Sequence, residues 1–176
     1  AAVTKVVRSN QIFAAREVKK FEDNFSKYNK SKYVKAVGNA TQGLHLALSA
    51  LEIGYGDEVI VTNYSWISTA SCILMQNATP VFVDIEFNTL GADPSKIEKC
   101  ITKKTKAIIV VHMFGNPCEI LEIKKIAKKN RLFLIEDTCE ALGSRYKSKY
   151  LGTFGDFGTF SFYYSHQITS GEGGMV

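Results

Sequence analysis

The amino-acid sequence predicts an α/β fold, built on a mostly parallel sheet with flanking helices. Short apolar segments rich in β-branched residues alternate along the chain with longer segments whose apolar residues recur at helical spacing. Neighbouring parallel strands need a helical crossover between them, so this alternation favours βαβ units over hairpins. No internal repeat interrupts the pattern, and 176 residues are enough for one substantial core.

We expect five helices, at residues 15–28, 41–51, 68–76, 94–100 and 119–130. In the second helix Leu44, Leu48 and Leu51 fall on one face, as a helix that covers a sheet requires. The fourth helix has the clearest start, because Asp93 can cap its free N–H groups and Pro94 suits the first helical position.

We expect six strands, at residues 33–37, 58–62, 80–84, 107–111, 132–137 and 159–162. Glycines mark two boundaries: Gly38 ends the first strand, and the turn at 54–57 introduces the second. The chain stops at Val176, just after Gly173 and Gly174, in what reads as the start of a further strand. We therefore expect a fragment of a longer protein.

The composition is that of an ordinary globular protein, with 45% hydrophobic and 22% charged residues. The net charge of +5 comes largely from lysine pairs spread over several segments. These pairs lack interleaved aromatic residues, so we expect solvated faces and no nucleic-acid partner. A positive field would still favour a substrate that carries phosphates.

Segments for membrane insertion or export are not evident in the sequence. No apolar run approaches the roughly 18 residues of a membrane span, and no charged-then-apolar leader opens the chain. The four cysteines form neither a CxxC pair nor a dense disulfide framework. We expect reduced thiols in a cytoplasmic protein without a membrane partner.

Ligands in such sheets gather at the carboxyl ends of the strands, and polar segments fall there. The first is Gly38–Thr41, which suits a phosphate because the first N–H groups of a helix are unpaired. An ordinary turn capped by Asn39 or Thr41 is the alternative. The second is 135–140, where Asp137 could pair with a protonated pyridine nitrogen, or could cap a helix or lie in a solvated loop.

A third polar segment runs from Ser161 to Gly174. Ser161 could bind phosphate, and the glycines would let the backbone approach a ligand closely. His166 lies between them, although a single histidine is more often a structural residue. Trp66, the one tryptophan, could pack in the core or stack on an aromatic cofactor ring. Each signal is weak alone, whereas their order and spacing are specific.

Together these segments resemble the DegT/DnrJ/EryC1/StrS family of pyridoxal-phosphate-dependent nucleotide-sugar enzymes. The stretches that carry the resemblance are 21–28, 38–48, 54–60, 78–84, 105–108, 112–115, 135–137 and 155–174. The resemblance implies a type I, aspartate-aminotransferase-like transferase fold. Residues 1–176 would be the N-terminal part of its large cofactor-binding domain, without the rest of the sheet and the C-terminal small domain.

The same resemblance implies pyridoxal 5′-phosphate (PLP) or pyridoxamine 5′-phosphate (PMP) as the cofactor. Ala40 and Thr41 would bind the cofactor phosphate, with Ser161 assisting. Trp66 would stack on the pyridine ring, and Asp137 would hold the ring nitrogen.

Two positions depart from the aminotransferase pattern of the family. His166 stands where those enzymes carry the lysine that forms a Schiff base with PLP, and an imidazole has no primary amine with which to form that bond. Glu140 stands where they usually carry glutamine. With Cys139, these residues resemble the 3-dehydratases of GDP-4-keto-6-deoxymannose and CDP-4-keto-6-deoxyglucose type, although Gln167 replaces the second histidine frequent in that branch.

That branch implies C3 dehydration of a nucleotide-linked 4-keto-6-deoxyhexose in deoxysugar biosynthesis. His166 and Asp137 would be catalytic, with His166 as acid and base near neutral pH, and Glu140 would be a cofactor contact. The implied partners are a nucleotide sugar, glutamate as amino donor and a second copy in a homodimer. A reductase would join them only if an iron–sulfur cluster used Cys139 and further cysteines after Val176; no other metal is expected. A sugar aminotransferase and a non-catalytic relative are the alternatives.

Overall fold

A computed structural model describes residues 2–13 and 15–176. Seven strands form one sheet in the order β1-β9-β8-β5-β4-β2-β3. They are β1 (Ala36–Val37), β2 (Glu58–Thr62), β3 (Thr79–Val83), β4 (Thr105–Val111), β5 (Phe133–Asp137), β8 (Phe157–Ser161) and β9 (Gly174–Met175). Strand β9 pairs antiparallel with β1 and β8, and the other pairs are parallel. The predicted mostly parallel sheet is confirmed.

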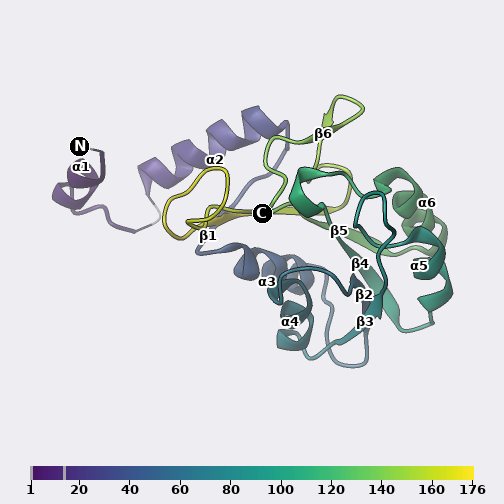
Figure 1. The fold of residues 1–176 in the computed structure, drawn as a ribbon. Helices are drawn as coiled ribbons and strands as arrows, with labels where there is room; N and C mark the ends of the chain where they lie inside the picture. Colours follow the sequence, from purple (N-terminus) through teal and green to yellow (C-terminus); the bar gives the residue numbers. More distant parts are fainter. Residues whose placement is uncertain (1, 14) are drawn as a thin grey trace.

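Helices cover both faces of the sheet (Figure 1). The described helices are α1 (Ala2–Arg8), α2 (Arg16–Asn29), α3 (Ala40–Ala50), α4 (Ser68–Met75), α5 (Pro94–Cys100) and α6 (Ile120–Asn130), with a short 3-10 turn, η1, at Met113–Gly115. Helices α3 and α4 lie on one face, and α2, α5 and α6 lie on the other. Helix α1 buries none of its described residues and lies apart from the sheet in Figure 1.

The core divides along the alternation of strand side chains. Ile108 and Val110 of β4 pack with α5 and α6, whereas Ala107 and Ile109 pack with α3 and α4. A third cluster joins Phe25 of α2 to the β8–β9 end of the sheet. A central strand buried on both faces explains why its sequence reads as a continuous apolar run.

Most of the predicted elements are observed, with boundaries shifted by a residue or two. The start of α5 is as expected: Asp93 Oδ1 accepts a hydrogen bond from Ser95 N at 2.9 Å. The strand expected at 33–37 is wrong in extent, because pairing with the two residues of β9 supports only Ala36–Val37. Helix α1 and the small hairpin of β6 (Arg145–Tyr146) and β7 (Lys149–Tyr150) were not predicted.

The structure agrees with two further expectations, on the lysine pairs and on the cysteines. The lysine pairs are exposed, as solvated faces require, and all four cysteines are free thiols. Within residues 2–13 and 15–176, no helix has the length and apolar character needed to cross a membrane.

Candidate active site

A cavity of about 560 Å³ opens at the carboxyl edge of the sheet. The segments that follow β1, β2, β4, β5 and β8 all contribute to its wall. Every residue that the sequence singled out for the site lies in this lining: Ala40, Thr41, Trp66, Asp137, Glu140, Ser161 and His166. Parallel strands bring these residues together because their carboxyl ends meet at one edge.

The start of α3 forms one wall of the cavity. Asn39 caps the helix, since its Oδ1 accepts a hydrogen bond from Gln42 N at 3.0 Å. The capping interpretation is therefore correct for Asn39, but it leaves Ala40 and Thr41 free: within the described chain, neither backbone N–H has an acceptor. The Thr41 hydroxyl donates to Ser68 Oγ at 2.8 Å. A helix start of this kind can hold a phosphate.

Gly174 of β9 packs against the peptide between Asn39 and Ala40, where α3 begins. A Cβ at this position would lie 2.5 Å from the carbonyl carbon of Asn39 and 2.7 Å from Ala40 N. The expectation that the glycines admit a ligand is wrong for Gly174, which is buried against this peptide. Only glycine lets β9 approach the start of α3 so closely.

Asp137, the last residue of β5, is held from two directions. Its Oδ2 accepts a hydrogen bond from Thr69 Oγ1 at 2.8 Å, and its Oδ1 accepts one from Cys139 N at 3.3 Å. The residue is only 6% exposed. Asp137 therefore neither caps a helix nor lies in a solvated loop, and its carboxylate can meet a cationic group in the cavity.

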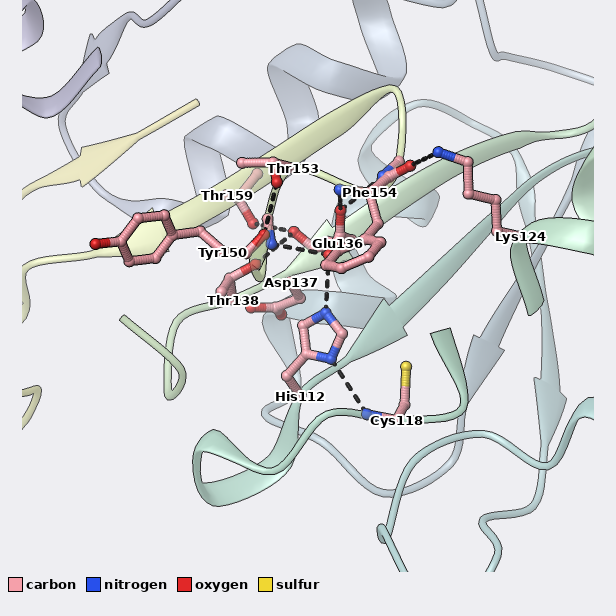
Figure 2. Close-up of polar contacts among 12 residues, drawn as sticks. His112, Cys118, Lys124, Glu136, Asp137, Thr138, Tyr150, Thr153, Phe154 and Thr159 are labelled. Carbon is pink, nitrogen blue, oxygen red and sulfur yellow. Dashed lines mark hydrogen bonds and ion pairs between the residues drawn. The ribbon is translucent and has the colours of Figure 1, made fainter. Parts of the chain in front are cut away.

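Glu136, the preceding residue, points to the opposite face of β5 and is fully buried (Figure 2). Its Oε1 accepts from Phe154 N at 2.6 Å and Gly155 N at 2.7 Å, and its Oε2 accepts from Gly152 N at 2.8 Å. His112 Nε2 lies 3.0 Å from Oε2. Glu136 thus holds the strand end on which Asp137 sits.

The hydrogen bonds also assign the tautomer of His112. Its Nδ1 accepts a hydrogen bond from Cys118 N at 3.3 Å, so Nδ1 carries no proton (Figure 2). The ring proton is on Nε2, which donates to Glu136. This buried pair was not recognised as a structural unit in the sequence, because its partners lie far apart along the chain.

Trp66 stands at the rim of the cavity with 76% of its surface exposed. Core packing, one of the two interpretations of this tryptophan, is therefore wrong. An indole with this much free surface can cover a flat aromatic ligand.

The loop after β8 carries His166 into the cavity wall. Its backbone N donates to Tyr163 O at 3.1 Å, and the two rings are edge-on at 6.5 Å between centroids. Within the described chain the imidazole has no hydrogen-bond partner, which leaves both ring nitrogens available to a ligand. Ser161, at the base of this loop, is 6% exposed, and its Oγ accepts from Tyr163 N at 3.3 Å.

Glu140 and Gln167 link this loop to its neighbours. Gln167 Nε2 donates to the carbonyl oxygen of Glu140 at 2.7 Å. Glu140 Oε2 in turn accepts from Phe114 N at 2.9 Å. The segments after β4, β5 and β8 are therefore joined at the mouth of the cavity.

Cys139 also lines the cavity, but it is a poor nucleophile. Burial, together with the nearby carboxylate of Asp137, raises the pKa of its thiol well above the usual value. Among residues 2–13 and 15–176, no three His, Cys, Asp or Glu side chains lie close enough together to hold a metal ion.

Sequence reasoning missed three hydroxyl residues of the cavity: Ser65, Ser68 and Thr69. They follow β2 directly, and their signal is the cluster of hydroxyl side chains after a buried strand. Ser68 contacts Thr41 and Thr69 contacts Asp137, so the first turn of α4 touches both parts of the site.

A mostly parallel sheet with helices on both faces, and a cavity between a helix start and a buried aspartate, is the architecture of an aminotransferase-like domain. The chain belongs to the DegT/DnrJ/EryC1/StrS aminotransferase family, whose sequence pattern matches residues 1–176.

Three similar proteins illustrate the range of this family. The chain is 50% identical over 159 residues to the GDP-perosamine synthase of Escherichia coli O157:H7, covering 90% of this chain and 44% of that protein. The aminotransferase from Psychrobacter cryohalolentis superimposes with a TM-score of 0.95 at 42% identity, over 99% of this chain and 45% of that one. The E. coli GDP-4-keto-6-deoxy-D-mannose-3-dehydratase with bound hydrated PLP superimposes with a TM-score of 0.92 at 37% identity. The match covers 99% of this chain and 46% of that one. The chain thus spans less than half the length of these relatives.

Proposed function

We propose that residues 1–176 are the N-terminal part of the large domain of a PLP- or PMP-dependent enzyme that removes the C3 hydroxyl of a nucleotide-linked 4-keto-6-deoxyhexose. One observation carries this proposal: His166 lines the cavity together with Asp137 and the α3 start, and none of the described lining residues is a lysine. The described part of the lining thus offers a base but no lysine amine for a covalent link to the cofactor.

The described residues fit the cofactor. The carboxylate of Asp137 suits a protonated pyridine nitrogen, since it lies in the cavity lining and is oriented by hydrogen bonds from Thr69 and Cys139. The free N–H groups of Ala40 and Thr41 suit the phosphate, and Ser161 lines the same cavity. When bound, the cofactor supplies an electron sink through its protonated ring.

Trp66 and Glu140 complete the assignment of the cofactor site. The exposed indole of Trp66 would cover the ring and exclude water from one side. Glu140 would act mainly through the loop that it holds, because its carboxylate already accepts a hydrogen bond from Phe114 N. The relative with bound PLP, 37% identical to this chain, supports the same cofactor.

His166 is assigned the proton transfers. Its imidazole has a ring nitrogen that can take up a proton and return it, as general acid–base catalysis of the dehydration requires. The link from Gln167 to the Glu140 carbonyl keeps the loop against the cavity while the ring itself stays unpaired within the described chain. Asp137 would hold the ring nitrogen of the cofactor through its carboxylate.

The partners are part of the proposal. The positive net charge of +5 favours a nucleotide sugar, whose phosphates are negative. Glutamate would return the amino group to the cofactor after each turnover. A second copy in a homodimer, and the half of the protein after Val176, would supply the remaining substrate contacts. An iron–sulfur cluster and a reductase enter only if that half carries further cysteines.

A nucleotide-sugar aminotransferase is the second candidate. It is favoured by the 42% identity to the aminotransferase from Psychrobacter cryohalolentis. An aminotransferase would need a lysine that reaches the cavity from outside the described residues. An amino sugar formed from glutamate would distinguish it from a dehydratase.

Reduction with borohydride tests the absence of a covalent anchor. Full-length protein is loaded with PLP, reduced, digested and searched by mass spectrometry for a pyridoxyl-lysine peptide. We expect no stoichiometric adduct on a single lysine in the wild-type protein, and a stoichiometric pyridoxyl adduct at position 166 in His166→Lys. Exposed lysines would give only scattered, substoichiometric adducts. A stoichiometric adduct on one lysine of the wild-type protein would refute the proposal.

A further inference from the structure

We propose that Thr69, supported by Ser65, is a positioning residue that holds the Asp137 carboxylate in place for the cofactor ring. The inference rests on the proposed function, in which Asp137 pairs with the ring nitrogen. It adds a chain of two hydroxyl groups, which reaches Asp137 from another element of the fold.

The distances define the chain. Thr69 Oγ1 lies 2.8 Å from Asp137 Oδ2, and Ser65 Oγ lies 2.7 Å from Thr69 Oγ1. Thr69 is 1% exposed, so water does not compete for its hydroxyl. Both contacts have the length of good O–H···O hydrogen bonds.

The direction of the chain follows from proton counting. A hydroxyl has one proton, and that of Thr69 is donated to Asp137. The contact between Ser65 and Thr69 can then form only with Ser65 as the donor. The chain runs from Ser65 through Thr69 to Asp137, and it matches an ionised carboxylate, which only accepts.

Two hydrogen bonds orient the Asp137 carboxylate, and the one from Thr69 Oγ1, at 2.8 Å, is the shorter. The other, from Cys139 N to Oδ1, is 3.3 Å long and comes from the same loop as Asp137. Thr69 comes from α4, whose Cys72 and Ile73 are fully buried in the core. The hydrogen bond from Thr69 therefore ties the Asp137 carboxylate to a helix that packs in the core, whereas the bond from Cys139 N ties it only to its own loop.

The same turn of α4 also reaches the phosphate end of the site. Ser68 accepts a hydrogen bond from the Thr41 hydroxyl at 2.8 Å. Two consecutive residues thus contact the two groups that would hold opposite ends of the cofactor. Losing the Thr69 contact should disturb the ring end while the phosphate end stays anchored.

The test compares matched variants of the full-length protein in PMP and PLP binding, measured by the quenching of protein fluorescence. Thr69→Val keeps the shape and removes the hydroxyl, and we expect binding to weaken by at least about tenfold, the lower limit for a lost hydrogen bond to a charged group. Thr69→Ser keeps the hydroxyl and should bind within about twofold of wild type. Thr62→Val is the control, because Thr62 is equally buried but contacts Tyr64 N instead of Asp137.

The outcomes separate this inference from the proposed function. If wild-type protein binds neither cofactor form, the proposed function fails and the inference fails with it. If wild type binds but Thr69→Val binds equally well, only the inference is overturned. Should Thr69→Val not fold, Ser65→Ala decides: about threefold weaker binding supports the chain, and unchanged binding overturns it.

Discussion

Replacing Glu136 with glutamine removes the charge at the most heavily hydrogen-bonded side chain near the site. The carboxylate accepts from three backbone N–H groups and from His112 Nε2, two donors on each oxygen. A glutamine keeps one oxygen and turns an N–H₂ group toward the other two donors. A change of tautomer at His112 does not help, because Nδ1 must stay unprotonated to accept from Cys118 N.

The expected cost follows from this count. Two hydrogen bonds to a charged group are lost, each worth about 1.5 to 3 kcal/mol, and buried donors remain unpaired. Removing a buried charge recovers part of its desolvation cost. We therefore expect Glu136→Gln to lower the free energy of unfolding by about 3 kcal/mol, a large share of the 5 to 15 kcal/mol typical of a domain.

Urea unfolding of the full-length protein, followed by circular dichroism, measures this change. Glu98→Gln is the matched control, because Glu98 pairs with Lys129 at 2.6 Å on an exposed surface. It should stay within about 0.5 kcal/mol of wild type. A loss of less than about 1 kcal/mol in Glu136→Gln would show that the buried network is not what holds the end of β5.

Two further predictions concern the thiols and the glycine turn. Burial raises the pKa of Cys72 to about 12. Above about pH 9 the folded protein therefore binds more protons than the unfolded chain does. The free energy of unfolding should then fall with rising pH, by up to about 1.4 kcal/mol per pH unit. Urea midpoints measured between pH 8 and 11 check this, and the slope should flatten in Cys72→Ala; an unchanged slope would contradict the assignment. Gly174→Ala should weaken cofactor binding, because its Cβ would meet the Asn39–Ala40 peptide. Gly171→Ala, with φ of +85° but no atom within 4 Å of the added Cβ, should cost only about 1 kcal/mol of stability; equal cofactor affinities in the two variants would refute the packing role.

The main elements could be predicted because their signals are local. The periodicity of Leu44 and Leu48, the Asp93–Pro94 helix start and the apolar run of β4 each depend on residues close in sequence. The small hairpin and the pairing of β1 with β9 depend on partners distant in the chain, so their extent could not be read from local pattern. Tertiary contacts decide such short strands.

The candidate site shows the same division. Asp137 and His166 could be named because they occupy strand-end and loop positions in a recognisable order. Thr69 could not be named, because its role exists only through Asp137, 68 residues further along the chain. The sequence predicts that Gly174 lets a ligand approach the backbone. In the structure it is instead the backbone at the start of α3 that approaches Gly174, a contact that exists only in the folded sheet.

The central claim is that His166 replaces a covalent anchor in an enzyme that removes the C3 hydroxyl. One single-turnover measurement tests it most directly. Full-length protein loaded with PMP is mixed with GDP-4-keto-6-deoxymannose, and the sugar product is identified by mass spectrometry. We expect a product in which hydrogen replaces the C3 hydroxyl, and its loss in His166→Asn. A product that retains the C3 oxygen and carries an amino group at C4 would contradict the account.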